Sequence, residues 1–210
     1  LIVSEIPVPA TSGGGSTDSS GGTPPSAELN IAAALSFILA TQNADGSFAT
    51  PLLSDWGAIA LSAGDASEVT RKKLRDYLVS TSAGLSNATD YERRAMALMA
   101  LGTNPYTGTS VDYIAKILTY FDGTQFGDNS LVNDDIFAIY PLVDAGYTSS
   151  DDVIQKTVAF IVSKQKPDGS WEGSVDLTAA SVQALVQTSS LPSVSEALAK
   201  AKTYLHSKQQ

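Results

Sequence analysis

The sequence predicts an all-α protein made of repeated helix pairs. Apolar residues recur with helical periodicity after position 27, and similar stretches return about every 40 residues. Larger, more amphipathic helices alternate with helices rich in Ala, Gly and Ser. A repeat of two helices at this period is typical of architectures in which each unit packs mainly on its neighbours.

The helical periodicity is clearest near the C-terminal end. Ile154, Val158, Ile161, Val162 and Gln165 fall on one face of a helix. A Lys-Pro-Asp-Gly stretch then ends the helix in a tight turn, and an alanine-rich second helix follows. We expect four such pairs and one further helix: 28–42 with 55–63, 69–80 with 90–101, 111–121 with 134–145, 153–165 with 176–188, and 194–209.

The repeat length comes from the second helices, which share similar endings. Leu61, Leu101, Leu142 and Leu185 are separated by 40, 41 and 43 residues. Because the second helices have small side chains and few charges, they are expected to pack tightly as an inner layer. The bulkier first helices are then expected outside them.

Two stretches share a longer pattern, FILATQNADGSF at 37–48 and FIVSKQKPDGSW at 160–171. Each has an aromatic residue five places before a glutamine, and an Asp-Gly-Ser turn that leads to a second aromatic residue. The residues of the pattern are Phe37, Gln42, Gly46 and Phe48 in the first copy, and Phe160, Gln165, Gly169 and Trp171 in the second. The glutamines lie 123 residues apart, which is three periods of 41.

This pattern resembles the QW motif of prenyltransferase/squalene-oxidase repeats, in decayed form also at 77–85 and 121–126. The resemblance covers about 28–210 and implies an α/α toroid, in which the glutamine bonds an adjacent helix terminus and the aromatic residue packs over the turn. A closed ring of this family needs more than the about 4.5 helix pairs found here. Either the chain is truncated, or a partner completes the ring, or the ring stays an open arc. An open arc would expose apolar surface of the inner helices and favour a homodimer.

Several activities of the family do not fit the residues of this chain. The zinc site of the prenyltransferase β subunits and the thioester domains both need cysteine, which is absent, and the single histidine is His206. Cobalamin carriers also share the fold, but no corrin-binding motif is present in the sequence. We therefore expect no metal and no resident cofactor, and a cobalamin-type ligand is implied by the resemblance alone.

One enzymatic alternative stays open. Class II terpene cyclases use an Asp-x-Asp-Asp proton donor at the start of an inner helix, and the matching stretch here is Val132-Asn133-Asp134-Asp135. By resemblance Asp134 would be the general acid beside Asp135, although valine replaces the first acid that would support its proton. Asn133, Asp134 or Asp135 also fits a simple helix cap. With 8% aromatic residues the chain offers little lining for a carbocation, so we favour a non-enzymatic function.

Acidic and aromatic residues near the starts of the inner helices are the candidate ligand site. They would line the mouth of the ring and bind a small molecule or a glycan, or else they are core packing in a purely structural spacer. These residues are Asp55, Trp56, Tyr91, Asp134, Phe137 and Tyr140.

Composition and the N-terminal stretch indicate the setting. A formal charge of −9 argues against a nucleic-acid partner, and no apolar run approaches the ~20 residues that span a bilayer. Residues 1–9 resemble the tail of a preceding β-type domain, 10–26 form a Gly/Ser/Thr/Pro linker, and 27–210 form the repeat domain. The sequence thus predicts a binding or scaffolding module of a larger extracellular or cell-surface protein, of bacterial origin.

Overall fold

The computed structural model describes residues 30–64 and 66–209, and their regular structure is helical. The prediction of an all-α fold is thereby confirmed for these residues. The helices belong to one compact unit, Ile31–Gln210. The expected β-type tail at 1–9 and the linker at 10–26 lie outside the described residues. Among the residues described, no helix has the length and apolar character needed to cross a bilayer.

The described residues form nine helices. They are α1 (Ile31–Ala40), α2 (Pro51–Ala63), α3 (Glu68–Ser80), α4 (Ala88–Ala100), α5 (Tyr113–Leu118), α6 (Asn133–Asp144), α7 (Asp152–Ser163), α8 (Val175–Val186) and α9 (Val194–Lys208).

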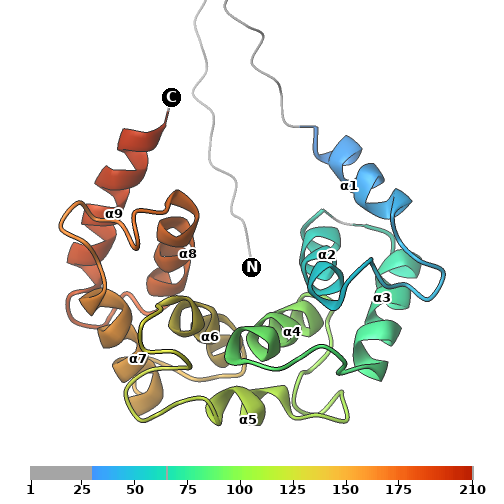
Figure 1. The fold of residues 1–210 in the computed structure, drawn as a ribbon, viewed down its shortest axis with the longest axis horizontal. Coiled ribbons are helices and arrows are strands. Elements are labelled where there is room, and N and C mark those ends of the chain that lie inside the picture. The colour runs from blue at the N-terminus through green and yellow to red at the C-terminus, as the bar shows by residue number, and fades with distance from the viewer. Residues whose placement is uncertain (1–29, 65, 210) are drawn as a thin grey trace, which may run out of the picture. The chain divides into compact units, whose positions relative to one another are not determined.

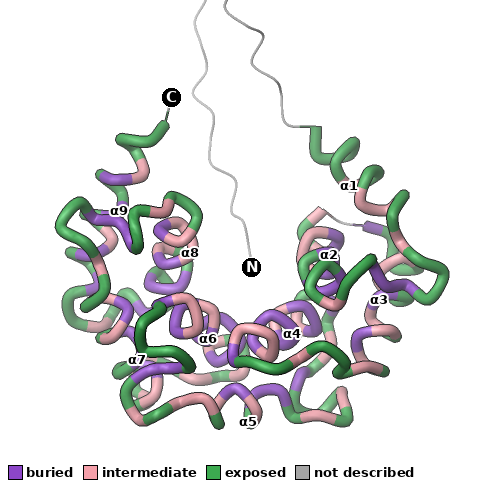
Figure 2. Tube along the Cα trace, in the orientation of Figure 1, coloured by how far each residue is buried: buried purple, intermediate pink, exposed green. Residues whose placement is uncertain are grey.

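Within this unit the helices form two rows that follow a curve. The inner row holds α2, α4, α6 and α8, and α3, α5, α7 and α9 lie on its outer side (Figure 1). Along the inner row α4 packs between α2 and α6, and α6 also packs on α8. Buried residues gather where the two rows meet, whereas α1 at the N-terminal end of the row has no buried residue (Figure 2).

The inner helices begin one to four residues before their predicted starts. The largest difference is at α2, which begins at Pro51. Proline suits the first helical position, where its missing N–H needs no partner. Thr50 caps this helix, because its side chain accepts a hydrogen bond from the Leu53 N–H.

The start of α6 differs from the sequence-based capping hypothesis. Its N-cap is Val132, which makes no side-chain cap, and Asn133, Asp134 and Asp135 are the first three helical residues. The hypothesis that one of these three caps the helix is therefore wrong. Their side chains instead bond other segments, as the site geometry below shows.

The leucines near the ends of the inner helices are spaced less regularly than the sequence suggests. The backbone carbonyls of Leu61, Leu98 and Leu142 each accept from the N–H five residues later, so these three leucines hold equivalent places at helix ends. In α4 the equivalent residue is therefore Leu98 rather than Leu101. The intervals become 37 and 44 residues, which shows that the unit around α4 has its own loop lengths.

Candidate functional site

The two copies of the sequence pattern fold into turns with the same hydrogen bonds. In the first, the backbone N–H and hydroxyl of Ser47 donate to Asp45 Oδ1 at 3.0 and 2.7 Å. In the second, Ser170 donates to Asp168 Oδ1 at the same two distances. These bonds lower the pKa of both aspartates, so both are ionised acceptors that close their own turn.

The glycines of these turns lie directly against the next outer helix. Gly46 has φ +92° and Gly169 has φ +88°, a region that favours glycine. A Cβ at Gly46 would clash with the backbone of Lys73 in α3, and one at Gly169 would clash with the backbone of Lys200 in α9. Glycine is therefore required at both positions for two separate reasons.

The glutamines bond the backbone around the turn. Gln42 Nε2 donates to the Gly46 carbonyl at 2.9 Å, and Gln165 Nε2 donates to the Gly169 carbonyl at 3.0 Å. Gln165 Nε2 also donates to the carbonyl of Ala197 in α9 at 2.8 Å. The second glutamine thus joins its turn to the following helix.

The aromatic residues of the pattern have unequal environments. Phe48 and Trp171 are buried, and Trp171 Nε1 donates to the Ile161 carbonyl at 2.7 Å. Phe160 is half-buried, whereas Phe37 is 75% exposed. Most of the pattern is therefore scaffold, and Phe37 alone presents a largely free aromatic surface.

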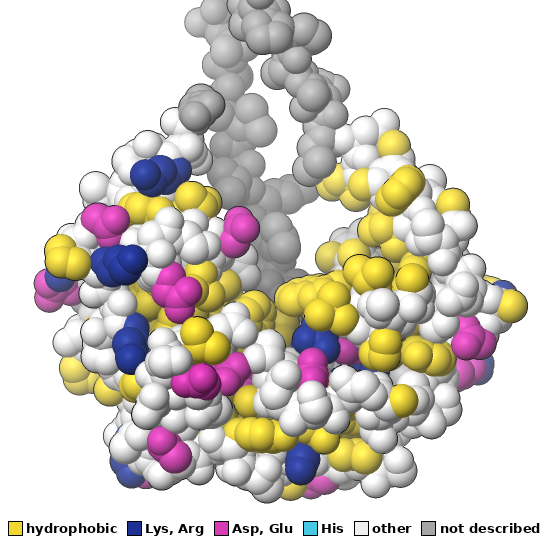
Figure 3. Space-filling view, viewed as in Figure 1, with side chains coloured by type: hydrophobic (Ala, Val, Ile, Leu, Met, Phe, Trp, Pro, Cys, Tyr) yellow, Lys and Arg dark blue, Asp and Glu magenta, His cyan; other side chains and the backbone are white. Residues whose placement is uncertain are grey.

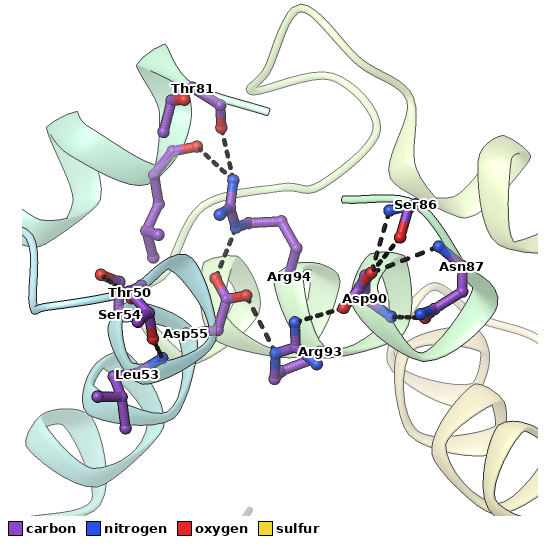
Figure 4. Close-up of polar contacts among 11 residues, drawn as sticks. Thr50, Leu53, Ser54, Asp55, Thr81, Ser86, Asn87, Asp90, Arg93 and Arg94 are labelled. Carbon is purple, nitrogen blue, oxygen red and sulfur yellow. Dashed lines mark hydrogen bonds and ion pairs between the residues drawn. The ribbon is translucent and has the colours of Figure 1, made fainter. Parts of the chain in front are cut away.

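Asp55 belongs to a buried ion cluster between α2 and α4. Its Oδ1 lies 2.6 Å from Arg94 Nε, and its Oδ2 lies 3.2 Å from Arg93 Nε (Figure 4). Burial raises the pKa of Asp55, while the two guanidinium groups oppose that shift. Arg94 Nη1 in turn donates to the Thr81 carbonyl at 2.5 Å, and Arg93 Nη2 lies 2.8 Å from Asp90 Oδ1. With its oxygens paired in this way, Asp55 ties helices together.

Tyr91 and Tyr140 pack against other residues rather than facing an open surface. Tyr140 is buried, its hydroxyl donates to the Ala180 carbonyl at 2.7 Å, and burial raises its pKa to about 12. Tyr91 is half-buried, and its ring centroid lies 6.4 Å from that of Tyr113 and 6.0 Å from that of Tyr120. Neither tyrosine lines a groove described below.

Trp56 and Phe137 come together although they lie on α2 and α6. Their ring centroids are 6.1 Å apart with an edge-to-face angle of 75°. Phe137 also contacts Tyr140, at a centroid distance of 6.0 Å. Trp56 keeps 41% of its surface exposed, which is the most accessible surface among the candidate aromatic residues. Of the six predicted ligand residues, the structure therefore links Trp56, Phe137 and Tyr140 in one aromatic cluster.

An apolar groove lies beside Trp56, between α1 and α2. Its volume is about 460 Å³. Hydrophobic side chains gather over these two helices in the space-filling view (Figure 3). The groove is lined by Phe37, Ile38 and Thr41 from the α1 side, Phe48 and Ala49 from the turn, and Leu53, Trp56, Gly57 and Ala60 from α2.

Sequence reasoning missed this groove, although α1 gave a signal. The helix reads IAAALSFILA, which has no polar face apart from Ser36. Such a helix is expected to be covered on all sides, yet the structure leaves Ile31 and Phe37 exposed. A helix that is apolar all round and still exposed indicates a binding surface.

A second groove, of about 260 Å³, is polar and lies between α3 and the end of α4. Its two arginines are both paired with Glu68, at 3.3 Å for Arg71 and 3.0 Å for Arg75. Arg75 Nε also donates to the Leu101 carbonyl at 2.9 Å. The groove therefore holds charges that are already matched within the protein.

Asp134 and Asp135, the candidate acids, have protein partners. Asp134 accepts a short hydrogen bond from the Thr89 hydroxyl and another from the Asp128 N–H at 3.1 Å. Asp135 is fully buried, and its Oδ1 accepts from the Phe126 N–H at 2.9 Å. Burial raises the pKa of Asp135 to about 7. Neither acid lines either groove.

A third acid at this place, Glu92 in α4, was not foreseen from the sequence. It is fully buried, and its two carboxylate oxygens have no hydrogen-bond partner. Burial, with Asp134 and Asp135 nearby, raises its pKa well above the ordinary value. Its position in the sequence, between a tyrosine and two arginines, looks like that of any surface glutamate.

Residues 30–64 and 66–209 contain no group of three His, Cys, Asp or Glu side chains placed to hold a metal ion. The single histidine, His206, is exposed on α9. No family model, curated protein or solved structure matches the chain. The groove and the buried acids are therefore interpreted from their own chemistry.

Proposed function

We propose that Ile31–Gln210 is a binding module that takes a small apolar ligand in the groove between α1 and α2. The observation that carries this proposal is a concave apolar site of about 460 Å³ that contains the exposed rings of Trp56 and Phe37. Sites for small molecules are concave, mostly apolar and of this size. Covering the rings would remove apolar surface from water, which is the main favourable contribution to such binding.

The lining favours an apolar ligand over a glycan. Glycan recognition needs several hydrogen-bond donors and acceptors beside an aromatic ring, whereas the polar groups among the side chains that line the groove are the Trp56 indole N–H and the hydroxyl of Thr41. That hydroxyl already donates to the Ile38 carbonyl at 2.7 Å. A cobalamin-type ligand has no more support, because its amide side chains would meet the same lack of polar partners.

Trp56 is expected to be the main contact. Its ring makes an edge-to-face contact with Phe137, which restricts the side chain before binding and lowers the entropy that binding would cost. Trp56 lines the groove and is 41% exposed, so a flat or chain-like apolar group would lie against it. Gly57 next to it leaves room for the Phe48 ring, which closes the floor of the groove.

The wider setting that we propose is a non-catalytic module of a secreted or cell-surface protein. The Gly/Ser/Thr/Pro tract at 10–26 supports a multidomain arrangement. The inner row of α2, α4, α6 and α8 with outer helices around it supports an α/α toroid-type fold that stays open. A cyclase-type reaction through Asp134 is not proposed, because the described grooves do not reach that side chain.

The test uses N-phenyl-1-naphthylamine, a neutral apolar probe whose emission rises when it leaves water. Wild-type protein is expected to bind it saturably, and Trp56→Ala is expected to weaken binding at least about tenfold, which corresponds to ~1.4 kcal/mol. The matched control is Tyr106→Ala, because Tyr106 is also 41% exposed but lies away from the groove.

Two results would contradict the proposal. The first is equal probe affinity in Trp56→Ala and Tyr106→Ala. The second is a wild-type protein that ignores the probe while its tryptophan emission responds to a neutral oligosaccharide such as cellohexaose. The emission is informative because the chain has two tryptophans, and Trp171 is fully buried.

A further inference from the structure

The boundary between α4 and α6 contains buried carboxyl oxygens that lack a hydrogen-bond donor. Oε1 and Oε2 of Glu92 and Oδ2 of Asp135 are all buried without a partner. The two helices pack closely along the inner row. A buried polar group without a partner is costly, and a buried ionised carboxylate without one is far more costly.

The charged groups nearest Glu92 do not balance the negative charge of its ionised form. Asp134 and Asp135 face it from α6 and disfavour its ionised form, while Arg93 on α4 favours it. Arg93 is already engaged, because Asp55 lies 3.2 Å from its Nε and Asp90 lies 2.8 Å from its Nη2. The surroundings of Glu92 therefore carry excess negative charge.

Among the described residues, the other elements that pack on α4 bring acids, or cations that are paired or exposed elsewhere. From α2 the ionisable group is Asp55, an acid. On α5, Tyr113 neighbours Arg94, and Lys116 lies over the rings of two tyrosines. On α3, Arg71 and Arg75 pair with Glu68, Lys72 pairs with Asp76, and Lys73 is exposed.

We propose that Glu92 keeps a proton in the folded protein at neutral pH, and that this proton acts as a pH-sensitive latch between α4 and α6. A neutral carboxyl can stay buried at this place, because it adds no negative charge beside Asp134 and Asp135. Loss of the proton would place an unpaired charge between the two helices and loosen their contact.

The direction of the pH effect follows from the raised pKa of Glu92. Burial is the main cause, and the two aspartates add to it. Because the folded pKa lies above the unfolded value of 4.5, the proton's contribution to stability is complete below 4.5. It is lost as pH rises through the folded pKa. The pKa of Asp135 is raised to about 7, so its contribution to the stability of the fold is also expected to fall as pH rises.

The direct test is NMR of the wild-type protein labelled with ¹³C at the glutamate carboxyl carbons. The chain has six glutamates. Glu92 is expected to give one resonance that stays protonated well above pH 5 and that is absent in Glu92→Gln. If all the glutamate resonances titrate near or below their ordinary value, the proposal is overturned. That contradicting result can be obtained with wild-type protein alone, so it does not depend on whether Glu92→Gln folds.

The functional test is urea unfolding of wild type and Glu92→Gln between pH 4.5 and 8. Between the unfolded and folded pKa values of Glu92, the folded protein binds one proton more than the unfolded chain. The unfolding constant of wild type is therefore expected to rise about tenfold per pH unit relative to that of Glu92→Gln. The matched control is Glu196→Gln, an exposed glutamate on α9 that pairs with Lys200 at 2.7 Å, and it should follow wild type. If the free energy of unfolding changes with pH in the same way for wild type and Glu92→Gln, the proposal of a pH-sensitive latch is overturned.

Discussion

Three of the turns between first and second helices show two different ways of being held. In the α1–α2 and α7–α8 turns, Gln42 and Gln165 donate to a carbonyl four residues ahead in the same turn. The segment after α3 has no such glutamine. There Arg94 reaches back from α4 and donates to the carbonyls of Leu78 and Thr81, at 3.3 and 2.5 Å.

The second arrangement depends on a distant residue. Arg94 is fully buried, and its charge is balanced by Asp55, which lies 39 residues earlier in the chain on α2 (Figure 4). The glutamine turns are closed by hydrogen bonds from Gln42 and Gln165 to their own turns, and Gln165 adds one bond to Ala197 in α9. A substitution in α2 should therefore disturb the α3–α4 connection and leave the α7–α8 turn intact.

The largest expected effect is that of Asp55→Ala. It leaves Arg93 and Arg94 without their shared carboxylate in a buried place, and breaking such a cluster costs about 3–5 kcal/mol. The free energy of unfolding from urea titration measures this. The control is Asp76→Ala, an exposed aspartate that pairs with Lys72 on α3, where a loss of under ~1 kcal/mol is expected.

Similar losses for the two aspartate variants would show that the ion cluster does not support the α3–α4 connection. Hydrogen exchange then locates the effect. In Asp55→Ala the amides of α3 and α4 should lose protection more than those of α7 and α8. Uniform loss across all four helices would contradict the distinction between the two kinds of turn.

A smaller effect is expected from glycine substitution in a glutamine turn. Gly169→Ala combines a positive φ with a clash against the backbone of Lys200, and we expect a loss of about 3 kcal/mol. Gly102→Ala is the matched control, because Gly102 also has a positive φ but has open space around its Cβ position. That variant should lose about 1 kcal/mol. Equal losses would show that the turn does not need its close approach to α9.

The sequence predicted the helices and the glutamine turns because both are local. Apolar residues at helical spacing and an Asp-Gly-Ser turn are determined by neighbours a few residues away. Helix starts were less accurate, since α2 begins at Pro51 after its Thr50 cap, in a first turn whose Leu52 and Leu53 are exposed. At α6 the acids that resemble caps bond other segments instead.

The candidate site was less predictable because it depends on contacts between distant residues. Trp56 was named from the sequence, but its neighbour Phe137 lies 81 residues later and its groove is formed with α1. Asp55 was also named, yet its pairing with Arg94 makes it structural. Glu92 gave no signal, because its burial depends on how α4 meets α6.

The smallest effect should separate the two glutamines. Gln165→Ala removes bonds to the carbonyls of Gly169 and Ala197, and a loss of about 1–2 kcal/mol is expected, whereas Gln42→Ala removes the bond to Gly46 and should lose about 0.5–1 kcal/mol. Thermal unfolding of both variants measures the difference. If the two losses are equal, the bond to Ala197 adds nothing, and α9 is held to the α7–α8 turn by packing around Gly169 alone.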